Sequence, residues 1–153
     1  MWDFVKEQKP GFVLKTVLPN INMGGIRSDT QRASSAVFVS SLYEGDVSIY
    51  KSVLAQWMVN VKDTARLHLA ALVDPKVENE RILAFAQPVS YNKNLACLRR
   101  MYSKKRFPEE IEDDSKYLSK LDNSRGAELL RKFGRPGFTG LEETIRENVA
   151  GLL

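Results

Sequence analysis

The stretch that most constrains the fold of this 153-residue sequence is residues 59–75, VNVKDTARLHLAALVDP. It begins with a β-branched run and changes to a helical pattern with almost no loop between the two. Side chains with short oxygen-bearing groups cap helices, so we expect Asp63 or Thr64 to begin a helix over 64–73. A strand that turns into a helix this abruptly is typical of an α/β unit.

The same alternation of strand and helix patterns continues along the rest of the chain. Residues 12–18, FVLKTVL, are apolar on both faces apart from two positions, which is typical of a strand buried in a parallel sheet. We therefore predict an α/β fold with a largely parallel sheet, a single domain over 1–153, and a mainly helical C-terminal part. The predicted strands cover 12–18, 57–61 and 81–87; the predicted helices cover 2–9, 31–43, 64–73, 92–102 and 124–133, and a last helix opens at a capping box of Thr139 and Glu142.

Composition and charge disfavour several classes of function. The net charge of +4 is mild, and the basic run 99–106 is followed by five acidic residues within 109–114, so we expect no nucleic-acid surface. No apolar run reaches membrane-spanning length, and residues 1–11 lack the pattern of a signal peptide. The single cysteine, Cys97, fits a reducing compartment, so a cytoplasmic location without membrane contact is predicted.

Four segments in order carry a resemblance to a known family: KPGFVLKTVLPN, VNVKDTARLHLAALVDP, NERILAFAQPVSYNKNLACLRRMY and LDNSRGAELLRKFG. The chain resembles the C-terminal half of an extended short-chain dehydrogenase/reductase, within the NAD-dependent epimerase/dehydratase superfamily. It is most similar to fungal aldehyde and ketone reductases related to dihydroflavonol reductase and methylglyoxal reductase. The resemblance implies a partial Rossmann-like parallel sheet, a helical substrate-binding lobe, NADP(H) as cofactor, and a small carbonyl or polyketide-like substrate.

Two motifs that the resemblance leads us to expect are missing from this sequence. Members of the family bind the cofactor on a glycine-rich turn and reduce the carbonyl with Ser, Tyr and Lys, the last two spaced Tyr-x-x-x-Lys. Here Gly24 and Gly25 form an isolated pair, and none of the five tyrosines has a lysine four positions later. The N-terminal cofactor-binding half is thus expected to be absent, and the chain to be unable to carry out the reduction alone.

The resemblance also implies a set of site residues in the loop that follows residues 12–18. This loop would run beside the nicotinamide if a cofactor half were supplied, although a flexible connection without a ligand is an equally good interpretation. The implied cofactor-side residues are Pro19, Asn20 and Asn22; the implied substrate-pocket residues are Asn22, Met23, Gly24, Ser34 and Ser35.

Three other reactive side chains are better explained by structure than by catalysis. His68 lies in the middle of a helical pattern, which favours packing or a surface hydrogen bond. The position of Asp63 at the strand-to-helix junction favours a role as a helix cap or structural anchor. Cys97 is expected to be a small buried thiol. One histidine and one cysteine cannot supply a zinc site, so we predict no metal.

Three functional hypotheses remain open at this point. The chain could be the substrate-binding part of an NAD(P)H-dependent carbonyl reductase, with an unpaired strand edge over 12–18 that pairs with another chain. It could be a cofactor-independent biosynthetic isomerase or cyclase that uses the residual pocket. It could also be a non-catalytic partner of a full-length relative, or form a homo-oligomer, through the same edge.

Overall fold

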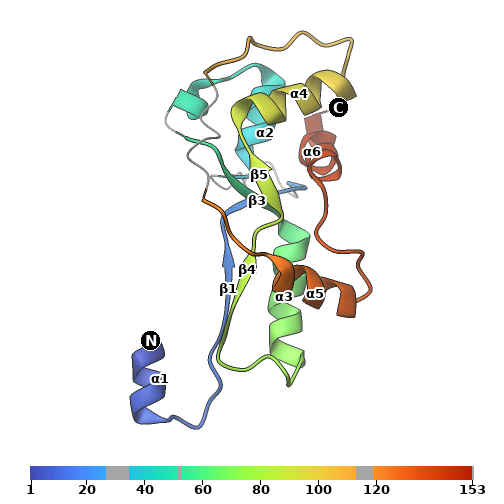
Figure 1. The fold of residues 1–153 in the computed structure, drawn as a ribbon. Helices are drawn as coiled ribbons and strands as arrows, with labels where there is room; N and C mark the ends of the chain where they lie inside the picture. The colour runs from blue at the N-terminus through green and yellow to red at the C-terminus, as the bar shows by residue number, and fades with distance from the viewer. Residues whose placement is uncertain (27–34, 52, 113–118, 153) are drawn as a thin grey trace.

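The structure is a computed structural model that describes residues 1–26, 35–51, 53–112 and 119–152. Strands and helices alternate through its first two thirds, and helices alone follow the last described strand (Figure 1). The helices are α1 (Trp2–Gln8), α2 (Val37–Glu44), α3 (Val61–Val73), α4 (Tyr91–Met101), α5 (Ser124–Lys132) and α6 (Leu141–Val149), with short 3-10 helices η1 (Ser48–Lys51) and η3 (Ala150–Leu152). The strands are β1 (Lys15–Pro19), β2 (Ile21–Met23), β3 (Gln56–Asn60), β4 (Glu80–Ala84) and β5 (Gln87–Val89).

The described strands form two small sheets. β1 and β4 pair in parallel, with Lys15 opposite Glu80. The second sheet has the order β2-β3-β5, in which β2 and β3 are parallel and β3 and β5 are antiparallel. The predicted α/β class with parallel pairing is confirmed, and the sheet is divided in two with one antiparallel pair added.

The helices form two groups around two apolar cores, and α3 contacts strands of both sheets. α3 and α5 pack on the β1–β4 pair, where Leu67, Ile82 and Leu129 are fully buried. α2, α4 and α6 gather around the other sheet at the opposite end of the molecule (Figure 1), with Met58 and Leu98 fully buried between them. α1 buries none of its residues and stands apart from the other helices.

The prediction of a strand over 12–18 was wrong in its first half, and the predicted burial on both faces was wrong throughout, because no residue of β1 is fully buried and Leu18 is 40% exposed. β1 begins at Lys15, while Phe12 and Val13 lie outside it with 53% and 48% of their surface exposed. Among the described residues β1 pairs with β4 alone, so its other edge is open. A parallel strand is normally covered on both sides, and here an apolar run is left without that cover.

The predicted strand over 81–87 is two strands, because the chain changes sheet within it. β4 pairs with β1, and after a short turn β5 pairs with β3; the N–H of Ala86 donates to the carbonyl of Met58 at 2.7 Å between them. The predicted loop after Pro19 likewise contains β2, which is short and pairs with residues far along the chain.

Helix boundaries differ from prediction where capping was inferred. α3 begins at Val61 and its N-cap is Asn60, whose side chain accepts from the N–H of Lys62, so neither Asp63 nor Thr64 is the cap. The predicted capping box before α6 is also wrong, since Gly140 is the N-cap and makes no side-chain bond. α2 begins at Val37 with Ala36 as its N-cap, so the helix predicted over 31–43 was wrong at residues 35–36, and its residues 31–34 lie outside the described residues.

Candidate functional site

The candidate site lies where β2 and β3 end. Because these strands are parallel and Met23 is opposite Asn60, their carboxyl ends meet at one edge of the sheet. In open α/β sheets, ligands bind outside the carboxyl ends of the strands. The loop that the resemblance assigns to cofactor and substrate therefore adjoins the strand-to-helix junction at the start of α3.

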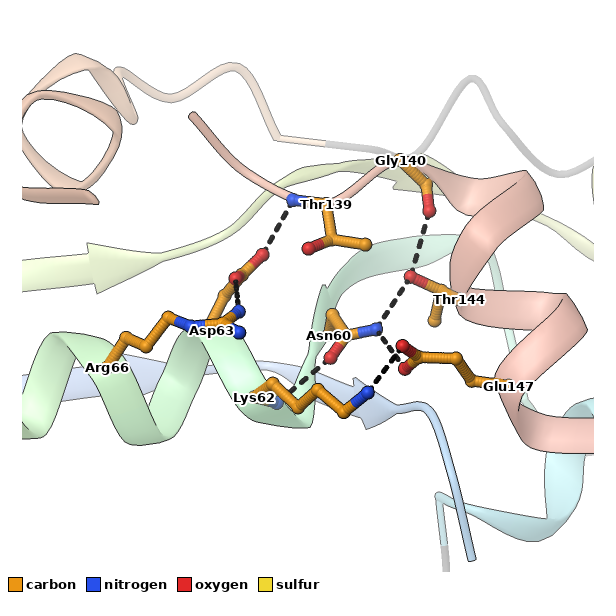
Figure 2. A network of polar contacts seen from close by, with 8 residues as sticks. All are labelled: Asn60, Lys62, Asp63, Arg66, Thr139, Gly140, Thr144 and Glu147. Atoms are coloured by element: carbon orange, nitrogen blue, oxygen red, sulfur yellow. Dashed lines mark hydrogen bonds and ion pairs between the residues drawn. The ribbon is translucent and has the colours of Figure 1, made fainter. Parts of the chain in front are cut away.

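Asn60 is the centre of this junction and is fully buried. Its side-chain oxygen accepts from the N–H of Lys62 at 2.9 Å, and its amide nitrogen donates to Thr144 Oγ1 at 3.2 Å and to Glu147 Oε2 at 3.0 Å (Figure 2). Thr144 in turn donates to the carbonyl of Gly140 at 2.8 Å. One amide thus caps α3 and ties its first turn to α6, with both its nitrogen and its oxygen bonded inside the protein.

An ion pair closes the exposed side of the same network. Lys62 Nζ lies 2.6 Å from Glu147 Oε1, and the Glu147 side chain is 21% exposed. Partial burial pushes the pKa of Glu147 upward, but the hydrogen bonds from Asn60 and Lys62 outweigh it and hold that pKa below its ordinary value. The carboxylate is therefore kept ionised, in a role that joins α6 to α3.

Asp63 is fully buried and is anchored on both carboxylate oxygens. Arg66 Nη1 donates to Oδ1 at 2.8 Å, and the backbone N–H of Thr139 donates to Oδ2 at 2.6 Å (Figure 2). The interpretation of Asp63 as a structural anchor agrees with this geometry. A carboxylate held by two such donors has no free oxygen aimed at a ligand, which disfavours a role as general base.

The predicted pocket residues on the loop make specific contacts with the junction. Thr64 Oγ1 donates to the side-chain oxygen of Asn22 at 2.7 Å, and Ser35 Oγ donates to the carbonyl of Asn22 at 2.9 Å. Met23 is 1% exposed and lies in the core. Contact of these residues with a ligand stays a prediction, and Ser34 lies outside the described residues.

Gly24 sits where a side chain would be crowded. Its φ is +133°, and a Cβ there would meet Val61 Cγ1 at 3.2 Å and the Asn60 amide nitrogen at 3.4 Å. Asn148 of α6 donates from its amide to the carbonyls of Gly24 and Ala36, both at 2.8 Å. The loop therefore passes close over the start of α3 and is held there by a residue of the last helix.

Asn20, in contrast, is exposed and faces a small cavity on the other side of the loop. The cavity has a volume of about 200 Å³, and Trp57 and Phe85 form its apolar wall with their rings stacked at 6.4 Å. The indole N–H of Trp57 donates to the carbonyl of Ser119 at 3.1 Å. Pro19 ends β1 and is exposed, so the two predicted cofactor-side residues at this point are accessible.

The described part of the chain holds no group of His, Cys, Asp and Glu side chains that could bind a metal ion. His68 is exposed, and its Nδ1 lies 2.8 Å from the carbonyl of Thr64, in agreement with a surface hydrogen bond. Cys97 is buried, as predicted, and burial raises the pKa of its thiol. The polar groups of the junction are thus engaged in structural bonds.

Sequence reasoning missed the residues that organise this junction. Asn60 was assigned to the strand interior, although an Asn directly before a helical pattern is a common N-cap. Thr144 and Glu147 lie in the last predicted helix, and no sequence signal pairs them with a residue more than eighty positions earlier. The cavity beside Trp57 and Phe85 was not predicted either.

Comparisons with known proteins confirm the resemblance to the reductases. No family model matches the chain. Aldehyde reductase 2 of Sporidiobolus salmonicolor is 37% identical over 97% of this chain and 44% of its own length. Ketoreductase adrE of Penicillium roqueforti is 34% identical over 97% of this chain and 45% of its own length. The chain is related over nearly all its residues to aldehyde and ketone reductases, and it spans about half the length of the curated relatives it matches.

The fold agrees with that relationship. The yeast methylglyoxal/isovaleraldehyde reductase Gre2, solved in complex with NADPH, superposes with a TM-score of 0.75 at 21% identity, over 99% of this chain and 50% of the other. At this identity the likeness establishes the fold alone. None of the helices in the described ranges is long and apolar enough to cross a membrane.

Proposed function

We propose that this chain is the substrate-binding part of an NADP(H)-dependent reductase of small aldehydes or ketones, and that it is active only when a cofactor-binding part docks on it. The reductase relatives support the reaction class, and the NADPH complex of a structural neighbour supports the cofactor. The loop 19–24 at the carboxyl ends of the strands would then border the nicotinamide and the substrate.

The observation that carries the proposal is the uncovered face beside β1. One edge of β1 has no partner strand in the described structure. Leu72 of α3 lies across a cavity from β1 and is 77% exposed, and Leu69 and Val73 of the same helix are each 52% exposed. A cavity of about 310 Å³ opens between β1 and α3. Apolar groups grouped along an open strand edge mark a surface that another element covers. The covering element we propose is a parallel strand and helix of a cofactor-binding part.

The test is reconstitution with a cofactor-binding part. The purified chain is mixed with the portion of the Sporidiobolus aldehyde reductase that it does not match, and NADPH oxidation is followed with a panel of small aldehydes and ketones. We expect turnover from the mixture and none from either part alone. NADPH-dependent reduction by this chain alone would overturn the proposal, and so would an inactive mixture in which the two parts form a stable complex.

A matched pair of variants separates docking from general damage. Leu72→Glu places a charge on the proposed docking face at a site already 77% exposed, so folding of the isolated chain is little changed. Leu54→Glu makes the same change at an exposed site away from α3. We expect the first variant to lose reconstituted turnover and the second to keep it. Equal activity of the two variants contradicts the assignment of the face, and cofactor-free turnover of a substrate would favour an isomerase or cyclase.

A further inference from the structure

A second cavity lies at the opposite end of the molecule from the β1 edge. It has a volume of about 590 Å³, within the range of small-molecule sites, and opens where α2 and α4 end side by side. In Figure 1 these helices lie at the far end from β1 and β4. Its walls are Tyr43, Met101, Tyr102, Ser103, Lys104 and Lys105. We call it the Tyr43–Lys105 cavity.

The apolar wall of this cavity is aromatic. The rings of Tyr43 and Tyr102 meet edge to face, with centroids 5.1 Å apart and planes at 75°, and Phe107 supports Tyr43 from 6.1 Å. All three rings are partly buried, so the wall is held in place by the core and not by solvent-exposed chains. The thioether of Met101 completes it, and such a flexible, polarizable group adapts to the outline of a ligand.

The rim of the cavity is positively charged. Lys105 Nζ lies 4.5 Å from the centroid of the Tyr43 ring, and Lys104 is beside it. Arg99 and Arg100 of α4 are paired with acidic side chains, whereas no ion pair among the described residues includes either of these lysines. A cation near the last turn of a helix stabilises its dipole, which explains a positive charge here but not an open cavity with an aromatic wall.

We propose that the Tyr43–Lys105 cavity binds a small aromatic carboxylate. The ring of the ligand would contact Tyr102 and Met101, and its carboxylate would pair with the ammonium of Lys105, which keeps its contact with the Tyr43 ring. None of the described residues that line the cavity carries a carboxylate that could compete for that ammonium. This site is separate from the loop 19–24 and from the β1 edge, so it is independent of the proposed reductase function.

The test uses naphthoate as the anionic probe and naphthalenemethanol as its neutral analogue, each titrated into the isotope-labelled chain with amide NMR as the readout. We expect saturable shifts at residues 102–105 with naphthoate and weaker binding of the alcohol. Lys105→Met should weaken naphthoate binding about fivefold, as expected for the loss of one partly solvated charge pair. Lys76→Met, which removes an exposed lysine elsewhere, should leave binding unchanged.

Three results would overturn the assignment. The first is equal naphthoate affinity in the Lys105→Met and Lys76→Met variants, and the second is equal binding of the acid and the alcohol. The third is a set of shifts concentrated on α3 and residues 12–13, which would place the probe on the exposed apolar face instead. Because Lys105 is exposed, its replacement is expected to leave the amide spectrum otherwise unchanged, and that spectrum reports directly whether the fold is retained.

Discussion

Replacing Gly126 by alanine sets two effects of opposite sign against each other. Gly126 lies in the first turn of α5, where alanine has the better helix propensity by at most about 1 kcal/mol. A Cβ at this position, however, would lie 2.7 Å from the backbone carbonyl oxygen of Leu83 and 2.8 Å from Cζ of Phe138. Both distances are shorter than van der Waals contact allows, so α5 would have to move away from β4.

The steric effect should prevail, because one of the two contacts is backbone. Overpacking a tight interface costs about 1–3 kcal/mol, and a strand carbonyl cannot turn aside as a side chain can. After subtraction of the helix-propensity gain, we expect Gly126→Ala to lower the free energy of unfolding by about 1–2 kcal/mol. Chemical denaturation followed by circular dichroism measures this, with Gly11→Ala as control, since a Cβ at Gly11 meets nothing within 4 Å.

A double-mutant cycle with Phe138→Leu divides the effect between its two causes. Removing the ring relieves the 2.8 Å contact and leaves the 2.7 Å contact with the Leu83 carbonyl. The cost of Gly126→Ala should therefore shrink in the Phe138→Leu background without disappearing. A Gly126→Ala protein as stable as the wild type, or more stable, would show that α5 does not pack against β4 this closely.

Three further predictions concern the polar groups that join distant segments. Asp63→Asn should lower the free energy of unfolding by about 2–3 kcal/mol in denaturation, because the amide group cannot accept from both Arg66 and the Thr139 N–H. Glu147→Gln should cost about 1 kcal/mol at neutral pH, as expected for a partly exposed pair. The difference in unfolding free energy between the wild type and Glu147→Gln should vanish as pH falls through the lowered pKa of Glu147. A stability difference that stays constant with pH would refute the reasoning. Burial raises the pKa of Tyr50 to about 12, so wild-type stability should fall as pH rises from 10 toward that value. Tyr50→Phe should reduce this pH dependence, with the remainder due to Tyr91 and Tyr102, whose pKa values are also raised by burial, and should cost about 1–2 kcal/mol for its lost hydrogen bonds.

What could be predicted from the sequence is what depends on neighbouring residues. The strand-to-helix change near residue 60 was found because β-branched and helical patterns are local, and the helices were placed to within a few residues for the same reason. The cap was misplaced because Asn60, Asp63 and Thr64 are all good capping residues, and the choice depends on where β3 stops pairing. β3 ends at Asn60 since its partner β2 ends at Met23.

The features that escaped prediction depend on distant residues. The run 81–87 reads as one strand, and nothing within it tells that its two halves pair with β1 and β3. Thr139 has the spacing of a capping box with Glu142, yet its N–H is used by Asp63, and Glu142 pairs with Arg100 and Arg146. In both cases a local pattern is overridden by a contact between segments far apart in sequence.

The carboxyl ends of β2 and β3 are covered by other parts of the chain, whereas the free edge of β1 is not, and this difference bears on function. At the carboxyl ends of β2 and β3, Asn60 bonds to Thr144 of α6, and Asp63 bonds to the N–H of Thr139, just before α6. Asn148 of α6 bonds to the carbonyl of Gly24, which lies 124 positions earlier in the sequence. Polar contacts that converge from three segments preorganise a loop without ligand present. Beside β1, apolar side chains of α3 face outward with nothing of the described chain upon them. The proposed function rests on this combination of a preorganised loop and an uncovered sheet edge.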